Sequence, residues 1–171
     1  YKGLYQIQHL DWKNGRVNYD QNFERPVPGM DFNHLAFSDM AVKADSFYFC
    51  DSRIDVKIQE AKLKEKSGLK ISQLYGRFVM DSVKMQLPDL YLRTPVSNLQ
   101  ASVDFDMNAF AEKNPGKIMA RVNGALGRSD LFLFIGDALP KQMKYRWPYY
   151  PMKVEGSFRG NMQRASFSGV R

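Results

Sequence analysis

Cysteine is almost missing from this sequence, which has one, Cys50, among its 171 residues. A single cysteine cannot close an internal disulfide, so the chain is not a small scaffold held together by disulfides. Histidine is nearly as scarce: His9 and His34 lie far apart, and no Cys/His cluster has the spacing of a zinc site. We therefore expect neither a disulfide framework nor a bound metal.

Long apolar runs are also missing. The longest covers residues 131–135, whereas a helix needs about 20 apolar residues to cross a bilayer. The chain begins at Tyr1 without an initiator methionine or a signal peptide, and it ends at Arg171 directly after an expected strand. We interpret residues 1–171 as a single β domain cut from a longer protein, whose targeting or anchoring elements would lie outside it.

The motifs of common active sites do not occur: there is no G-x-S-x-G, G-x-G-x-x-G, P-loop or H-E-x-x-H sequence. Asp104 and Asp106 share one face of an expected strand, where they alternate with apolar residues and are typical of a solvated surface. Asp51 and Asp55 are interpreted as a second solvated pair. His34 and Asp31 are a weak acid–base pair, and Cys50 is a small apolar residue. We therefore predict no enzymatic activity and no cofactor.

Acidic residues are fewer than basic ones: 18 Asp and Glu stand against 25 Lys and Arg, a formal charge of +7. We interpret the excess as an ordinary solvated surface. The alternative is attraction to an anionic partner, either lipid headgroups or nucleic acid. The basic residues are scattered rather than gathered into one run, which argues against nucleic acid as a partner.

What the sequence does contain is alternation of apolar and polar residues, over 53–59, 74–80, 83–87 and 99–107. Successive side chains of a strand point to opposite faces, so each segment has one apolar and one charged face. At Pro88 the phase slips, which predicts a bulge or a sheet edge because proline cannot donate to the ladder. We expect about ten short, meandering strands and hence a mostly β fold, a curved antiparallel sheet that is taco-like or an open sandwich.

The N-terminal region predicts further strands. Residues 4–19 predict a hairpin whose turn contains the Asn-Gly pair at 14–15. Residues 35–49 predict two short strands, because Asp39 and Asp45 interrupt the apolar pattern. The Asn-Gly pair at 123–124 predicts either a turn or a soft spot within a longer strand. The segment at 145–151, which is dense in aromatic residues and proline, predicts a rigid loop.

One segment breaks the β pattern. Residues 130–139 have apolar residues at helical spacing, with Ser129 or Asp130 as the N-cap and Pro140 as the stop. This predicts one short amphipathic helix, whose expected role is to cap the open end of an apolar sheet; weak membrane contact is the alternative. The polar segment at 20–33, with its prolines and glycine, predicts a loop.

One face of strand after strand carries Ile, Val, Leu, Phe and Met, and one short helix is too small to cover it. An antiparallel sheet can bury such a face by folding into a sandwich or closing into a barrel, or it can stay half open as a groove for an apolar ligand. Methionine is soft and adaptable, which suits a core as well as an acyl-chain surface. The residues predicted to line the inner face are Ile54, Val56, Ile58, Leu74, Phe78, Met80, Val83, Met85, Leu99, Val103 and Phe105.

Several short motifs follow one another along the chain. They are Phe32-Asn33-His34-Leu35 with Ser38-Asp39-Met40, Lys66-Ser67-Gly68-Leu69, Leu90-x-Leu92-x-Thr94-x-x-Ser97, Ser129-Asp130-Leu131 and Val154-x-Gly156-x-Phe158-x-Gly160-Asn161. In this order, over roughly residues 32–169, the sequence resembles the TamB branch of the AsmA-like envelope proteins. Each motif alone is a common strand-and-turn pattern, so the order carries the resemblance.

The resemblance implies a long protein that is anchored in the inner membrane by an N-terminal helix and extends across the periplasm. Its β segments would form a curved, taco-like sheet with an apolar interior, and its partner would be an outer-membrane barrel of the TamA type. Proteins of this family are implicated in moving phospholipid between membranes and in assembling some outer-membrane proteins. This chain would be one internal, periplasmic segment.

On this basis the sequence predicts an apolar β-groove for phospholipid acyl chains. The alternative is an interaction module that holds unfolded outer-membrane strands at open sheet edges. A third possibility is a carbohydrate-processing or other hydrolytic β-sandwich, for which the sequence offers no convergent polar site. A long open groove would favour the first, unpaired edges the second, and a compact pocket with clustered carboxylates the third.

Overall fold

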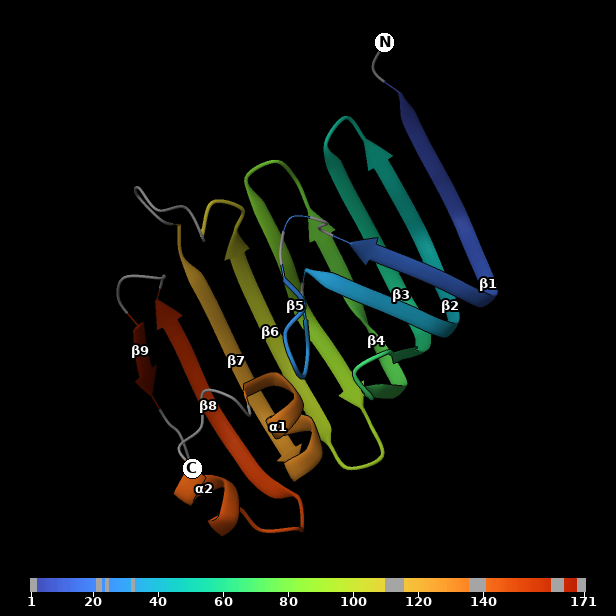
Figure 1. The fold of residues 1–171 in the computed structure, drawn as a ribbon. Helices are drawn as coiled ribbons and strands as arrows, with labels where there is room; N and C mark the ends of the chain where they lie inside the picture. Colours follow the sequence, from blue (N-terminus) through green and yellow to red (C-terminus); the bar gives the residue numbers. More distant parts are fainter. Residues whose placement is uncertain are drawn as a thin grey trace.

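The structure is a computed structural model that describes residues 3–20, 23, 25–31, 33–109, 116–135, 141–160 and 165–168. Within these ranges the chain forms nine strands and two short helices (Figure 1). The strands are β1 (Leu4–Asp20), β2 (His34–Cys50), β3 (Arg53–Glu65), β4 (Lys70–Met80), β5 (Lys84–Arg93), β6 (Asn98–Asp106), β7 (Ile118–Leu126), β8 (Met152–Gly160) and β9 (Ala165–Ser168). The helices are α1 (Arg128–Ile135) and α2 (Lys141–Arg146).

All nine strands belong to one sheet, in which each strand pairs antiparallel with the next along the chain. A meander of this kind needs only short connections, whereas parallel neighbours would need crossovers. The sheet is open and curved (Figure 1). The prediction of a mostly β fold built on a curved antiparallel sheet is therefore confirmed.

The expected hairpin over residues 4–19 is wrong, because β1 runs through it as one strand. Residues on both sides of Asn14 pair with β2 in the same direction, with shifts of register around Gly15. Asn14 has a φ of 55°, in the left-handed region that asparagine tolerates better than most residues. Gly15 lies against the ring of Trp12, where a side chain would collide. The Asn-Gly pair therefore makes a bulge that bends the strand instead of a turn that reverses it.

β2 is also one strand, instead of the two expected over residues 35–49. Asp39 and Ser46 have φ values of 51° and 56°, and the register with β3 shifts near both positions. The polar residues thus mark bulges and do not end the strand. The bent parts of β1 and β2 remain paired, and they curl together over the side of the sheet on which α1 lies (Figure 1). We call these bent parts, residues 16–20 of β1 and 34–38 of β2, the curled end.

The bulge expected at Pro88 is confirmed, since the register between β5 and β6 shifts between Leu87 and Leu90. On the neighbouring strand, Gly76 has a φ of +146°, and a Cβ there would lie 2.3 Å from the carbonyl oxygen of Asp89. The missing side chain at Gly76 therefore allows the bulged backbone of β5 to approach β4 closely.

Residues 123–124, which the sequence left open between a turn and a soft spot, lie inside β7. Gly124 pairs with Leu99 on β6 and with Val154 on β8. Its φ is +148°, and a Cβ there would lie 2.1 Å from the carbonyl oxygen of Asn98. Gly124 is thus a second point of close backbone approach within the sheet.

The helical segment differs from its prediction at both ends. α1 begins two residues before the predicted range of 130–139, and residues 136–140 lie outside the described ranges. The aromatic segment at 145–151, expected to be a loop throughout, begins within α2, which includes Tyr145. In the part of the chain that the structure describes, no helix is long and apolar enough to cross a membrane.

Asp130 was expected, as an alternative to Ser129, to cap α1, but it lies inside the helix with its side chain buried. Its carboxylate accepts hydrogen bonds from the hydroxyl groups of Thr94 and Ser97. The hydroxyl of Ser97 in turn accepts a hydrogen bond of 2.9 Å from the N–H of Gly127. This buried network anchors the start of α1 to the turn between β5 and β6.

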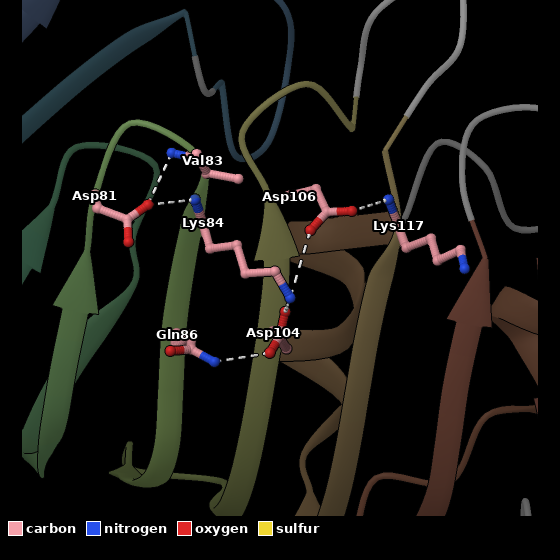
Figure 2. Close-up of polar contacts among 7 residues, drawn as sticks. All are labelled: Asp81, Val83, Lys84, Gln86, Asp104, Asp106 and Lys117. Atoms are coloured by element: carbon pink, nitrogen blue, oxygen red, sulfur yellow. Dashed lines mark hydrogen bonds and ion pairs between the residues drawn. The ribbon is translucent and has the colours of Figure 1, made fainter.

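The two faces of the sheet have different surroundings. Figure 1 looks onto the side that carries α1 and the curled end. Figure 2 looks onto the opposite side, where Lys84 and Asp104 project toward the viewer and the helices lie behind the strands. The helix and the curled end therefore lie on the side away from these charges.

Candidate functional site

Apolar side chains of neighbouring strands lie opposite one another and form rows across the sheet. One row runs from β3 to β7 through Ile54, Met80, Met85, Phe105 and Ile118. Cross-strand partners on one face of an antiparallel sheet are direct neighbours. The row is therefore a continuous apolar strip and not a set of isolated side chains.

A second row crosses the sheet nearer its other end, through Leu74, Leu92, Leu99, Gly124 and Val154. The remaining predicted positions on β3, β4 and β6 fall on the same face: Val56 opposite Phe78, Ile58 opposite Gly76, and Val103 between Leu87 and Ala120. We call the two rows and the residues between them the apolar face. The register thus brings ten of the eleven predicted groove residues onto one surface.

The apolar face is only partly covered. Each of these ten residues is half-buried. Among the described residues, the apolar side chains that are truly buried are Ala44, Ala61, Leu69 and Ala109. Burial removes apolar area from water at about 25 cal/mol per Å². A partly exposed face therefore leaves area that a ligand can still withdraw from water.

Val83 stands apart from the other predicted groove residues. It lies in the turn before β5, and 65% of its surface is exposed. Its N–H donates a hydrogen bond of 2.8 Å to the carboxylate of Asp81, and its carbonyl accepts one of 2.9 Å from Met107. The expected strand over 83–87 thus begins one residue later, because the Asp81 side chain closes a turn by binding the backbone ahead of it.

Residues of β7 and β8 extend the apolar face beyond the predicted set. Ala120, Val122, Val154 and Phe158 line a surface cavity of about 190 Å³ over these two strands. Their alternation with polar residues is visible in the sequence, and it identified both segments as strands. Only the pairing order shows that they belong to the same surface as Phe105.

The opposite face, which we call the polar face, carries charges linked across the strands (Figure 2). The Nζ atom of Lys84 lies 3.4 Å from Asp104 and 3.8 Å from Asp106. The side-chain amide of Gln86 donates to Asp104 at 2.8 Å, and the N–H of Lys117 donates to Asp106 at 2.8 Å. The two aspartates therefore serve as links between β5, β6 and β7, on the face where the sequence placed them.

Asp55, considered above with Asp51, is bound instead by Arg77 of the next strand. The guanidinium donates two hydrogen bonds to the carboxylate, at 2.9 and 2.7 Å, and these lower the pKa of Asp55. Because Arg77 is exposed, we expect this pair to add at most about 1 kcal/mol to stability. Asp51 lies in the turn between β2 and β3, with a φ of 53°.

His34 and Asp31 do come together, and both are buried. The Nδ1 atom of His34 lies 2.9 Å from Asp31, whose carboxylate also accepts hydrogen bonds from the N–H groups of Val27 and Asn33. The Nε2 atom of His34 lies 3.6 Å from Asp20, at the end of β1. The pair thus ties the loop before β2 to the ends of both β1 and β2.

Acid is expected to destabilise this corner of the fold, because the pKa values of Asp31 and Glu65 are both below their usual values of 3.8 and 4.5. For Asp31 the main cause is the hydrogen bond from Val27. Burial alone would raise the pKa of Glu65, but hydrogen bonds from Ser67 and Ala36 outweigh it. A carboxylate whose folded-state pKa is depressed stabilises the fold fully above the unfolded pKa, and this stabilisation is lost as pH falls through the folded value.

Urea unfolding at about pH 6, 4 and 3 measures this loss as a fall in the unfolding midpoint toward acid. Asp31→Asn and Glu65→Gln should lower the stability at the highest pH and make the decline toward acid shallower. A decline that is equally steep in the original chain and in both variants would contradict the assignment.

The arrangement of the apolar face suits binding by desolvation and not by ligation or proton transfer. Within the described ranges, no group of three His, Cys, Asp or Glu residues is placed to hold a metal ion. Partly exposed Ile, Val, Leu, Phe and Met side chains can cover an extended hydrocarbon chain while its polar end stays in water.

Comparison of the chain with protein-family models, with curated proteins and with solved structures returns no match.

Proposed function

We propose that this chain is an internal segment of a TamB/AsmA-like envelope protein, and that its apolar face carries phospholipid acyl chains between two membranes. The observation that carries the proposal is the apolar face itself: a surface continuous from β3 to β8 whose side chains are half-buried. The order of motifs in the sequence supports the family, and the open curved sheet agrees with the architecture that the family implies.

The transport is passive in this proposal. Acyl chains lie against the apolar face and lose contact with water, at about 25 cal/mol per Å² of apolar area buried. The headgroup stays in solvent at the open side of the sheet, and the net charge of +7 of the chain favours an anionic headgroup. α1 and the curled end cover part of the apolar face and so limit the width over which a lipid can spread.

The cellular setting is part of the same proposal. The segment lies in the periplasm, within a full-length protein that is anchored in the inner membrane and meets an outer-membrane barrel of the TamA type. Both contacts would be made by other parts of that protein. The chain itself contributes a stretch of the apolar path and no catalytic step.

The test is site-specific photocrosslinking in the full-length protein in cells. A photoreactive amino acid in place of Phe78 or Val103 is expected to capture phospholipid, because both positions lie on the apolar face. The same probe in place of Arg77 or Asp104, one residue away on the polar face, is expected to capture little or none. Mass spectrometry of the crosslinked protein identifies the adduct.

The matched positions make the result decisive. Each pair differs by one residue along the same strand, so probe chemistry and position along the sheet are closely matched. Equal capture of lipid from both faces, or none from either in a protein with an unchanged melting curve, would contradict the acyl-chain path. Capture of protein alone would favour the second candidate.

The second candidate is an interaction module that holds an extended outer-membrane protein strand. The observation that favours it is the edge of the sheet: among the described residues, β1 pairs on one side only, with β2. Along β1, every residue except Leu10 and Gly15 is exposed. A long strand with an unpaired edge is a template for adding another strand. Protein adducts from probes placed along β1 would favour this activity over lipid transport.

A further inference from the structure

A surface cavity of about 710 Å³ lies on the polar face. Its floor includes a row of side chains that are successive cross-strand partners from β4 to β8, namely Tyr75, Tyr91, Gln100, Asn123 and Glu155. Neighbouring strands lie about 4.8 Å apart, so this row is about 19 Å long. The cavity is therefore an elongated trough that crosses the strands, on the side of the sheet away from the apolar face.

Two tyrosines form one end of the row. The rings of Tyr75 and Tyr91 stack with centroids 4.6 Å apart and planes 18° apart. This separation is close to the spacing of adjacent strands, so the rings stack along the row. One ring face of Tyr91 is thus covered by Tyr75, and the other is directed toward β6, where Gln100 is the cross-strand partner of Tyr91. An aromatic face of this kind offers a flat apolar surface with a hydroxyl at its rim.

Two amides form the middle of the row. Gln100 and Asn123 are direct cross-strand partners, and both are exposed. Among the described residues, neither side chain makes a hydrogen bond or an ion pair with the rest of the protein. Each amide carries donors and an acceptor in one plane, so the pair can bind adjacent groups that both donate and accept. Sugar hydroxyls are groups of that kind.

A second row lies beside the first and also lines the cavity, through Ser102, Arg121, Ser157 and Ser168. The hydroxyls of Ser157 and Ser168 lie 2.7 Å apart. In the described part of the chain, the guanidinium of Arg121 has no ion pair or hydrogen bond, and its five N–H groups are donors toward the cavity. The trough thus has hydroxyl and guanidinium groups along one side and amides along the other.

The charges of the lining select against other ligands. Asp89 and Glu155 both line the cavity and offset the charge of Arg121, so an anion would meet two carboxylates. An acyl chain would leave amide, hydroxyl and guanidinium groups without partners, at a cost for each buried group. A neutral ligand with many hydroxyls and apolar ring surfaces suits both the polar rows and the aromatic rings that line the cavity.

We propose that this trough binds a neutral, extended oligosaccharide of β-linked hexose units. One sugar unit packs against Tyr91 at the end of the row, and the next units run along the row, where Gln100 and Asn123 bind their hydroxyls. Faces of β-sheets bind oligosaccharides in other folds. The proposal concerns the polar face alone and does not depend on lipid transport by the apolar face.

Isothermal titration of the 171-residue chain tests the proposal with cellohexaose and chitohexaose as the neutral probes and hexagalacturonate as the anionic one. We expect saturable binding of at least one neutral hexasaccharide at millimolar concentration or below, and no binding of hexagalacturonate. The double substitution Gln100→Ala with Asn123→Ala should weaken binding at least tenfold. Both residues are exposed and make no contact that the fold needs, so the variant should melt as the original chain does.

A matched control removes an exposed glutamine elsewhere on the sheet: Gln6→Ala, on β1, should leave sugar affinity unchanged. Tyr91→Leu, which keeps an apolar side chain of similar reach, should also weaken binding because it removes the aromatic ring and its hydroxyl. No binding of either neutral hexasaccharide at millimolar concentration, binding of the anionic probe alone, or binding that the double variant leaves unchanged would each overturn the proposal.

Discussion

Gly124→Ala is expected to lower the free energy of unfolding by about 2–5 kcal/mol, the sum of backbone strain and overpacking. Gly124 has a φ of +148°, and an added Cβ would lie 2.1 Å from the carbonyl oxygen of Asn98 and 2.9 Å from the Cα of Leu99. Both atoms belong to the backbone of a central strand, so they cannot move aside as the end of a flexible side chain would. Chemical denaturation of the two proteins measures the difference.

Gly68→Ala is the matched control for this substitution. Gly68 also has a positive φ, of +108°, but a Cβ there would meet nothing within 4 Å. Its replacement should cost only the strain of the left-handed region, about 1–2 kcal/mol. The difference between the two variants isolates the backbone collision. Equal costs at the two sites would show that β6 and β7 do not approach as closely as the structure has them.

Val103→Asp is expected to abolish most of the lipid binding that we propose. Val103 lies at the middle of the apolar face, between Leu87 and Ala120, where a carboxylate would have to stay hydrated. Acyl chains could then not cross this point without burying an unpaired charge. The phospholipid that co-purifies with the protein, measured by native mass spectrometry, should fall at least tenfold.

The same change also costs stability, about 1–3 kcal/mol for an unsatisfied polar group in a half-buried site. A control must therefore separate loss of binding from loss of fold. Ser102→Asp adds a carboxylate one residue away, on the polar face, opposite Arg121. It should change stability by about 0.5 kcal/mol or less and leave lipid occupancy unchanged. A similar drop in lipid for both variants at temperatures where both are folded would argue against the apolar face as the binding surface.

The two proposals assign different ligands to the two faces of one sheet: acyl chains to the apolar face and an oligosaccharide to the polar face. The apolar face is continuous because the paired apolar residues of β3 to β8 stay on one side of the sheet, although the register shifts within the β3–β4 and β4–β5 pairs and at the Pro88 bulge. That same register aligns Tyr91, Gln100 and Asn123 on the opposite face. A one-residue slip of any central strand would break both surfaces at once. The variants above can therefore be read independently only if the register is intact, which the melting curves check.

Local alternation was enough to predict most central strands and the face on which their side chains lie. Ile54, Phe78, Met85 and Val103 were assigned to one surface from spacing alone, because side-chain direction in a strand depends only on position along it. The bulge at Pro88 was predictable for the same local reason, since proline lacks the N–H that a ladder needs.

Errors arose where a local signal had more than one tertiary outcome. The Asn-Gly pair at 14–15 can close a hairpin or bend a strand. It bends the strand here because the residues on both sides of it pair with the long strand β2. The alternation through Val83 continued into a turn, because the Asp81 carboxylate binds two backbone N–H groups there. Asp130 carries the signature of an N-cap, but the hydroxyls of Thr94 and Ser97 lie close enough to bind its carboxylate.

The sequence by itself determined the β class of this protein, the faces of its central strands and the absence of recognised catalytic motifs, because these depend on residue type and spacing over a few positions. Only the tertiary structure decided which strands pair, that β1 and β2 curl over the apolar side, and that Tyr91, Gln100 and Asn123 share one trough. The physical reason is that cross-strand contact depends on register between segments distant in the chain. That register is set by the packing of all the strands together, and no single segment encodes it.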